Sequence, residues 1–227
     1  MLVPLTRNIF EQLIPAVATS EQYSYCWGSF PDVIKRVSIS AVGISIVVII
    51  HYFVHYSSFI LLMSGLIFGL YWFWGPVLSA SLKNIACRRY QYAGFWQGRV
   101  LDVYVTEEVI GQEETVNQKG QLVVVENLEA RINIEVGDRQ GFTTTLQTPL
   151  KKFHRDIQPG QAALMVVMSN RPDLSQIDLC SDIYIPSRKI WVSDYPYLRR
   201  DVFIEVSNEI KARLRNQQEQ EIDYSRY

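Results

Sequence analysis

The sequence predicts a membrane α-helical hairpin, followed by an all-β soluble domain and a C-terminal helix. Three observations predict it. The stretch from Val37 to Leu82 contains no Asp, Glu, Lys or Arg. Apolar and polar residues alternate strictly from Ala130 to Val136, which is typical of a half-buried strand. Near the C-terminus an apolar stripe at helical spacing comprises Phe203, Val206, Ile210 and Leu214.

This pattern divides the chain into six segments. They are an amphipathic, interfacial N-terminal segment at 1–32, a transmembrane hairpin at 33–82, a basic juxtamembrane linker at 83–94, a cytoplasmic β-barrel domain at 95–195, an amphipathic helix at 196–217 and a flexible tail at 218–227. In the first segment we expect a short helix from Arg7 to Leu13, capped by Thr6 and lying on the membrane surface. The N-terminus shows no signal-peptide pattern.

We place the two membrane helices at about 33–55 and 59–81, with the turn at Tyr56 to Ser58. Each is close to the roughly 20 residues that a bilayer core requires. Basic residues flank only the outer ends, so the positive-inside rule puts both termini on the cytoplasmic or stromal side. A single re-entrant segment is the alternative. The basic residues expected to contact lipid headgroups are Lys35, Arg36, Lys83, Arg88 and Arg89.

Small and aromatic residues in the second helix indicate a contact with another membrane protein. Gly65 and Gly69 have the G-x-x-x-G spacing that lets helix backbones approach closely. The run that follows them consists of Tyr71, Trp72, Phe73 and Trp74. The alternatives are packing within the hairpin for the glycines, and an interfacial aromatic belt or packing within the protein for the run.

Two histidines in the first membrane helix are candidate ligands. His51 and His55 are four residues apart, so they lie on one helix face. Such histidines can ligate haem or chlorophyll, and can also carry protons. The alternative is that they are ordinary interfacial residues, because His55 lies at the turn, where water reaches it.

The segment 95–195 predicts five to seven short strands, which fit a small SH3-like or OB-like barrel. We expect Glu107 to Lys119 to form a solvated loop or hairpin tip, and a carboxylate metal site there lacks the spacing of a calcium loop. We expect a helix from Tyr197 to Gln217, with Pro196 in its first turn and Asp194 as its cap.

The residues give little support to catalysis. The sequence has no G-x-S-x-G, H-E-x-x-H or P-loop pattern, and its three cysteines include no C-x-x-C spacing. A net charge of −1 gives no bulk attraction to nucleic acid. We therefore assign no catalytic residue, metal ligand or required cofactor. One basic cluster is a candidate contact for an acidic soluble partner or phosphate, with a solvated loop as the alternative: Lys151, Lys152, His154 and Arg155.

Several stretches resemble a family of cyanobacterial and plastid membrane proteins. They are Pro4–Arg7, Phe10–Pro15, Ala18–Thr19, Tyr25–Gly28, Ile157–Gly160 and Asp194–Leu198. Members of that family are often labelled phosphate transporter permeases. Two crossings and the lack of a coupling-loop motif argue against that label here. The resemblance implies a thylakoid membrane setting and an accessory or assembly role for a photosynthetic complex such as a photosystem.

Two functions follow as hypotheses. The first is a non-enzymatic, membrane-anchored accessory factor, whose hairpin docks on a large membrane complex while the β domain holds a subunit or assembly intermediate. The second is a small oligomeric transporter or channel component, in which His51 and His55 line a path.

Overall fold

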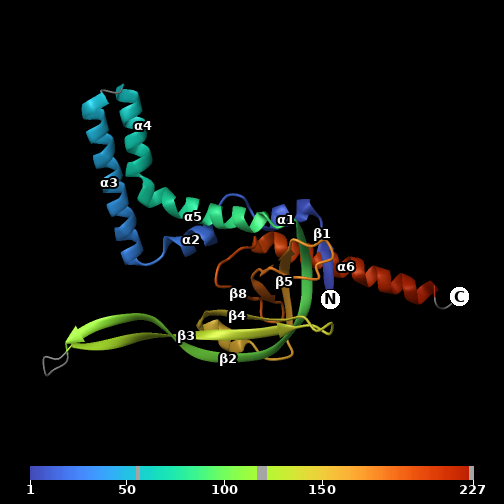
Figure 1. The fold of residues 1–227 in the computed structure, drawn as a ribbon. Coiled ribbons are helices and arrows are strands. Elements are labelled where there is room, and N and C mark those ends of the chain that lie inside the picture. The colour runs from blue at the N-terminus through green and yellow to red at the C-terminus, as the bar shows by residue number, and fades with distance from the viewer. Residues whose placement is uncertain (55–56, 117–121, 225–227) are drawn as a thin grey trace. The chain divides into compact units, whose positions relative to one another are not determined.

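The computed structural model describes residues 1–54, 57–116 and 122–224. The chain divides into two compact units. The helical unit comprises Glu11–Arg89 and Tyr197–Val206, and the β unit comprises Met1–Phe10, Tyr90–Pro196 and Ser207–Tyr227. The sequence therefore combines a helical hairpin with an antiparallel β domain, as predicted (Figure 1).

The helices of the first half begin with α1 (Arg7–Leu13), whose bounds match the prediction. The Thr6 hydroxyl accepts a hydrogen bond from the backbone N–H of Ile9 at 3.5 Å, as a cap does. The inner face of α1 does not lie on a membrane surface, because Phe10, Leu13 and Ile14 are buried in the protein. A helix lying at the membrane surface would keep this face for lipid.

Helix α2 (Ser20–Trp27) was not predicted, since the only helix expected in the segment 1–32 was that at Arg7–Leu13. It begins with a reciprocal capping box between Thr19 and Gln22, which satisfies two backbone N–H groups at once. Gly28 follows with φ +68°, a conformation that favours glycine, and the chain turns there into the next helix.

Helix α3 (Phe30–Val54) is continuous, but the predicted second membrane helix is not. It divides into α4 (Ser58–Gly69) and α5 (Tyr71–Arg88), which meet at a 67° bend. Two side chains satisfy the backbone groups that the bend frees. The Trp74 indole donates to the Ile67 carbonyl at 2.8 Å, and the Ser40 hydroxyl accepts from the Trp72 N–H at 3.2 Å. The prediction of one straight helix over 59–81 is therefore wrong.

A buried amide pair joins α2 to α5. Gln22 and Asn84 are both fully buried, and each side-chain amide donates to the other's carbonyl oxygen, at 3.0 and 2.8 Å. Gln22 also accepts from the Thr19 N–H and donates to the Tyr197 carbonyl. Since buried amides are costly unless paired, this network fixes which faces of the helices meet.

The β unit is one antiparallel sheet of eight strands, in the order β4-β3-β2-β5-β7-β8, with β1 paired to β2 and β6 to β5. The strands are β1 (Leu2–Leu5), β2 (Tyr92–Val116), β3 (Leu122–Gly137), β4 (Thr143–Pro149), β5 (Ala162–Ser169), β6 (Leu179–Cys180), β7 (Ile183–Ile185) and β8 (Ile190–Val192). A 3₁₀ turn, η1 (Lys152–Asp156), follows β4.

Backbone pairing leaves this sheet open within the described residues, since no ladder joins β4 to β8. Side chains bring the ends together instead. The Thr148 hydroxyl of β4 donates to the carbonyl of Ser193, just after β8, at 2.9 Å. The antiparallel β domain is thus established, while the choice between an SH3-like and an OB-like barrel remains a prediction.

The strand lengths differ from the prediction of short strands. β2 has 25 residues and β3 has 16, and they pair from Arg99 with Gly137 out to Val116 with Leu122. The segment 107–116 is therefore strand within a β-hairpin, so of the predicted solvated loop or hairpin tip the loop is wrong. Residues 117–119 of the same prediction lie outside the described residues. Two pairs of adjacent glutamates hid this strand, because glutamate is depleted in strands that pack on a core.

The core of the β unit lies on one face of the sheet. β5 is buried on both faces, as its uninterrupted apolar run from Ala163 to Met168 predicts. The core cluster comprises Trp96, Val100, Ile132, Ile134, Val136, Ile157, Ala163, Met165, Val167, Ile183, Ile185, Ile190 and Val192. Burial of Ile132, Ile134 and Val136 confirms the alternating strand predicted from the sequence.

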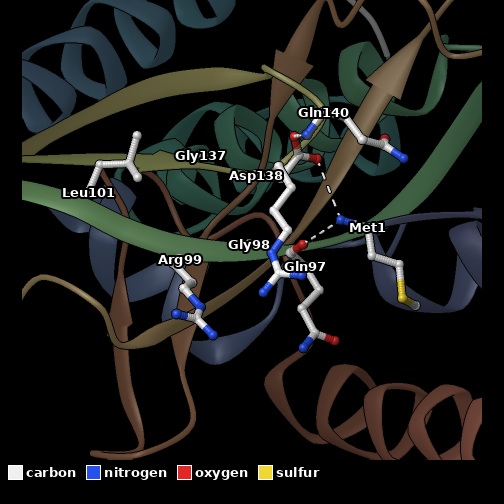
Figure 2. Close-up of a pocket in the computed structure, with 9 residues that line it drawn as sticks. Met1, Gln97, Gly98, Arg99, Leu101, Gly137, Asp138 and Gln140 are labelled. Atoms are coloured by element: carbon white, nitrogen blue, oxygen red, sulfur yellow. Dashed lines mark hydrogen bonds and ion pairs between the residues drawn. The ribbon is translucent and has the colours of Figure 1, made fainter.

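The turn between β3 and β4 is organised by Asp138 (Figure 2). One carboxylate oxygen accepts the backbone N–H groups of Gln140 and Phe142, and the other accepts the Trp96 indole N–H at 3.0 Å. The Met1 ammonium lies 3.5 Å away. Burial raises the pKa of Asp138, but these donors outweigh it and hold that pKa below its ordinary value. The carboxylate is therefore charged and fully engaged.

Helix α6 spans Arg200–Tyr224, so it starts later and ends later than predicted. Its predicted apolar stripe is confirmed at Phe203 and Val206, which are buried. Asp194 does not cap it, because its carboxylate pairs with Arg131. The predicted tail at 218–227 is helical through Tyr224, and residues 225–227 lie outside the described residues.

The amide pair gives a testable prediction. Asn84→Leu leaves Gln22 buried without one partner, so we expect a loss of about 1–3 kcal/mol in the free energy of unfolding. The Gln22→Leu/Asn84→Leu double variant should lose less than the sum of the single losses, since it leaves no orphaned amide. Thermal unfolding of the detergent-solubilised protein measures this, with the exposed Asn208→Leu as control. Equal effects of Asn84→Leu and Asn208→Leu would contradict the prediction.

Candidate functional site

The largest unexplained surface of the helical unit is apolar. Among the described residues, α3 is the helix that is long and apolar enough to cross a membrane by itself, and α4 with α5 meets the same test only as a bent pair. Only 6% of the most apolar 18-residue window of α3 is buried within the protein. Exposed side chains on the two helices include Val42, Ile46, Ile49, Phe53, Phe59, Leu62 and Ile67. Such a surface marks a membrane or protein contact.

The two glycines of the G-x-x-x-G spacing, Gly65 and Gly69, have different surroundings in the structure. A Cβ on Gly69 would lie 3.4 Å from the Ile44 side chain of α3, so Gly69 faces its own hairpin. That corrects its assignment to an external partner. A Cβ on Gly65 would meet nothing within 4 Å. Gly65 instead lines an apolar groove of about 450 Å³ between α3 and α4.

The close approach of α3 and α4 depends on a glycine that the G-x-x-x-G spacing did not indicate. A Cβ on Gly43 of α3 would lie 2.8 Å from the Phe68 ring of α4 and 3.0 Å from its Cβ. In the sequence, Gly43 is one of several small residues of this helix that could contact the second helix, and nothing there singles it out. What marks Gly43 is the bulky Phe68 side chain opposite it on α4, and this pairing is visible only in the structure.

The aromatic run packs mainly against its own unit. The Trp72 ring lies 6.1 Å from that of Trp27, and the Tyr71 ring lies 5.1 Å from that of Trp74. The Tyr23 hydroxyl donates to the Phe73 carbonyl at 3.2 Å. Of the four side chains only Phe73 is largely exposed. The run therefore stabilises the bend, and Phe73 is the member left for an external contact.

The basic residues that flank the apolar block fall into two groups. Arg36 donates to the carbonyls of Cys26 and Trp27 at the end of α2, and Arg88 forms an ion pair of 2.6 Å with Glu11. These two arginines thus bind the protein itself rather than only lipid headgroups.

The other three flanking bases are exposed. They are Lys35, Lys83 and Arg89. The Lys83 ammonium lies 5.2 Å from the centre of the Tyr25 ring, within the range of a cation–π contact. These three remain the candidates for headgroup contacts.

The histidine pair is only half described. His51 lies on α3, and its Nδ1 atom is buried without a hydrogen-bond partner. His55 lies outside the described residues, so the predicted pair is not tested by the structure. Among the described residues, no group of three or more His, Cys, Asp or Glu side chains could hold a metal ion.

The β unit presents a two-stranded ribbon, made by β2 and β3 between Glu107 and Ala130 (Figure 1). Pairing of β2 with β5 ends at Arg99, and pairing of β3 with β4 starts at Arg131. Within the described residues the ribbon therefore has no third strand. This is unusual, since an isolated pair of strands is marginally stable in water.

One face of the ribbon is apolar and exposed. Side chains alternate along β3, so Leu122, Val124 and Leu128 lie on the same face as the buried Ile132. The first three are 75%, 55% and 56% exposed. Val109, opposite Leu128, is 45% exposed. The face of β3 that packs in the core therefore continues into the ribbon, where its apolar side chains are exposed.

The ribbon is also acidic. Residues 107–130 include six glutamates and a single lysine. Four of the glutamates fall within the segment that we expected to be a loop. A face with apolar residues and a surrounding negative charge favours a basic partner that also offers apolar side chains.

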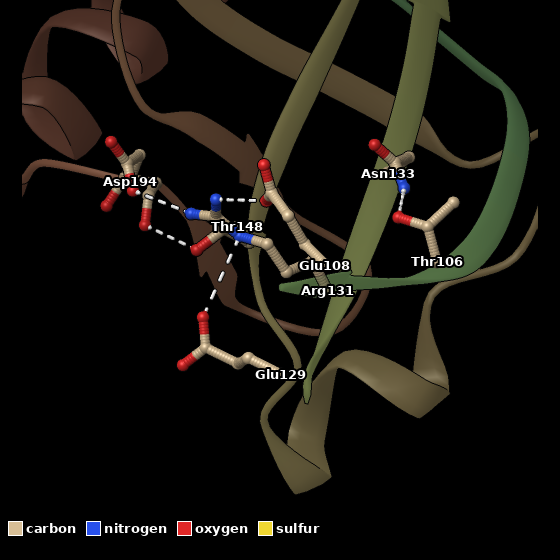
Figure 3. A network of polar contacts seen from close by, with 8 residues as sticks. Thr106, Glu108, Glu129, Arg131, Asn133, Thr148 and Asp194 are labelled. Atoms are coloured by element: carbon tan, nitrogen blue, oxygen red, sulfur yellow. Dashed lines mark hydrogen bonds and ion pairs between the residues drawn. The ribbon is translucent and has the colours of Figure 1, made fainter. Parts of the chain in front are cut away.

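An arginine anchors the root of the ribbon (Figure 3). Arg131 of β3 lies 2.6 Å from the Glu108 carboxylate of β2 and 3.5 Å from that of Asp194. Glu129 lies 3.9 Å from the same guanidinium. The hydrogen bond that Arg131 donates to the Glu108 carboxylate raises the pKa of Arg131. Desolvation opposes this rise, and the charges of Glu108, Asp194 and Glu129 add to it. Sequence reasoning missed this residue, because its partners lie 23 and 63 positions away.

The predicted basic cluster is placed on η1. Lys151, Lys152 and Arg155 are exposed, but His154 is only 2% exposed and accepts the Lys151 N–H on its Nδ1 atom. Burial, aided by the Lys151 charge, lowers the pKa of His154 to about 4. His154 is therefore neutral near pH 7 and structural, which corrects its assignment as a partner contact.

The family model that matches the sequence covers residues 3–219, almost the whole chain. The chain belongs to DUF8619, a family of unknown function. No curated protein and no solved structure matches it. The helical and β units thus occur together as one family architecture, and its function has to be inferred from the surfaces described above.

The two glycines of the hairpin give a matched test. We expect Gly43→Ala to cost about 1–3 kcal/mol, because the new methyl group forces Phe68 to shift. Gly65→Ala should be nearly neutral, because open space surrounds it. Thermal unfolding in a mild detergent compares the two variants. A greater loss for Gly65→Ala would show that α3 and α4 meet along another face.

Proposed function

We propose that this protein is a non-enzymatic, membrane-anchored adaptor that presents its β unit to a partner at the membrane. The observation that carries the proposal is the uncovered apolar surface of α3. Burying a single Leu or Ile side chain is worth about 1.5–3 kcal/mol, so a helix with this many exposed apolar residues requires a nonaqueous environment.

The dimensions support an anchor made by the whole hairpin. The uncharged part of α3, from Val37 to Val54, would be about 27 Å long, close to the roughly 30 Å of a bilayer core. With 12 residues, α4 reaches only about 18 Å. The start of α5, beyond the bend, would complete the second crossing back to the first side of the membrane. It would then lie at the interface, where aromatic residues are favoured. Both ends of the hairpin then lie on one side of the membrane.

Helix α5 supports an interfacial position by its two faces. The face that includes Pro76, Ala80 and Asn84 is buried within the helical unit. Leu78, Leu82 and Ile85 are exposed and lie on the opposite side of the same helix. A helix that packs on protein with one face and offers apolar side chains on the other suits the membrane surface.

The hairpin topology is tested by the accessibility of its tip. In a variant whose native cysteines are replaced, Ser58→Cys should react with an impermeant maleimide only from the side opposite the β unit. Ser187→Cys, in the exposed turn before β8, is the control and should react from the other side. If Ser58→Cys reacts only after the membrane is dissolved, the hairpin is re-entrant and the two-crossing topology is wrong.

The ribbon is the surface that we propose for the partner. Its apolar face and its glutamates favour a basic protein, and Arg131 holds the ribbon to the domain. The resemblance to thylakoid proteins extends the proposal: the partner would belong to a photosynthetic complex or its assembly intermediate, and the soluble unit would lie on the cytoplasmic or stromal side.

Co-purification tests this partner. From gently solubilised membranes, the protein should recover a membrane complex, and Glu114→Lys/Glu126→Lys should reduce that recovery at least about tenfold, since like charges would oppose a basic surface. The control, Asp156→Lys/Asp173→Lys, changes the net charge equally at exposed positions of the β unit that are not part of the ribbon. Recovery of the protein alone, or equal losses in both variants, would contradict the proposal.

A further inference from the structure

A second feature of the β unit is independent of the anchor and the ribbon. A cavity of about 610 Å³ lies between the start of β2 and the turn that follows β3. Its size falls within the range of small-molecule sites. The residues that line it are Met1, Gln97, Gly98, Arg99, Leu101, Gly137, Asp138, Arg139 and Gln140.

Two glycines let β2 and β3 approach closely beside this cavity. Gly137 lies opposite Arg99 in the strand ladder, next to Gly98. A Cβ on Gly98 would lie 2.1 Å from the Trp96 ring and 2.4 Å from the Gly137 carbonyl oxygen, so a side chain cannot be accommodated there. A β-bulge between Val100 and Asp102 then displaces Leu101 to the cavity wall.

The charges of the lining are unbalanced. Asp138 is its one acidic residue, and its oxygens are engaged by Gln140, Phe142 and Trp96. Arg99 and Arg139 are exposed at the cavity, and within the described residues neither has an ion pair. By contrast, Arg36, Arg88 and Arg131 bind carbonyl or carboxylate oxygens of the protein itself.

Amide groups accompany the arginines. Gln97 and Arg99 are two residues apart on β2 and project from the same side of the strand (Figure 2). Gln140 lines the cavity from the turn, next to Arg139. Guanidinium forks match phosphate and carboxylate oxygens, and amide N–H groups add further donors.

We infer that this cavity binds a phosphate monoester, with Arg99 and Arg139 as the anion-binding residues. Two guanidinium groups balance the charge of nearly −2 that such a group carries at pH 7. Gln97 and Gln140 are placed to donate to the remaining oxygens. The rigid turn around Asp138 holds Arg139 beside β2, so the site is formed before the ligand arrives.

Fluorescence of the detergent-solubilised full-length protein tests this site, because the Trp96 indole bonds to Asp138 at the cavity wall. Titration with glycerol 3-phosphate should give a saturable change that equal concentrations of chloride do not. Arg99→Gln and Arg139→Gln should each weaken binding at least about tenfold, the loss expected for one charge-assisted contact. The control is Arg188→Gln, an exposed arginine before β8, which should bind normally.

A second titration separates the sources of phosphate. Short-chain phosphatidic acid that binds through the same two arginines, where glycerol 3-phosphate does not, would identify a lipid headgroup as the natural ligand. Short-chain phosphatidylcholine is the control for the acyl chains. If neither phosphate ligand gives saturable binding, or if the arginine variants bind as tightly as the native protein, the site does not exist.

Discussion

Helix α3 carries more apolar surface than the chain can cover, and the helical unit is arranged around that constraint. No charged residue falls between Val37 and Leu82, so hydroxyl groups and the flanking arginines supply the polar contacts. Arg36 binds the last carbonyls of α2, beside the start of α3. Ser40 accepts the Trp72 N–H at the bend. Each satisfies a backbone group where no water can be relied on to do so.

The buried amide pair follows from the same constraint. If α3 and α4 occupy an apolar phase, the hydrophobic effect does not select which faces of the remaining helices meet there. A reciprocal pair of hydrogen bonds between Gln22 and Asn84 selects one arrangement, since any other leaves two amides unsatisfied. Specificity in this unit therefore comes from polar contacts, whereas in the β unit it comes from core packing around Trp96 and its neighbours.

Sequence reasoning succeeded where the signal is local and periodic. The charge-free block, the helix at Arg7–Leu13 and the alternating strand at Ala130–Val136 each depend on neighbours within a few residues. It failed where partners are remote. The bend between α4 and α5 depends on Ser40, which lies 32 residues from Trp72, and the long β2 strand depends on its pairing with β3. In the sequence, a glutamate-rich segment resembles a solvated loop unless the strand that pairs with it is known.

The candidate sites show the same contrast between local signals, which the sequence reveals, and remote contacts, which it does not. Lys151, Lys152 and Arg155 were predicted as a basic surface, and they are exposed. His154, adjacent to them in sequence, is buried, because a 3₁₀ turn directs neighbouring side chains to different sides. Arg99 and Arg139 attracted no attention in the sequence, since 40 positions separate them and neither belongs to a motif. Only the closing of β3 onto β2 places both at one cavity.

The glutamates of the ribbon solve a problem that its apolar face creates. A two-stranded ribbon offers two open edges and an uncovered face, and both promote association between copies of the same chain. Charges of one sign repel a second copy, which carries the same charges, while they attract a surface of the opposite sign. Lysine would protect the edges equally well, so the choice of glutamate at six positions does more than prevent aggregation. Under the function proposed above, it also favours a basic partner as the cover for Leu122, Val124 and Leu128.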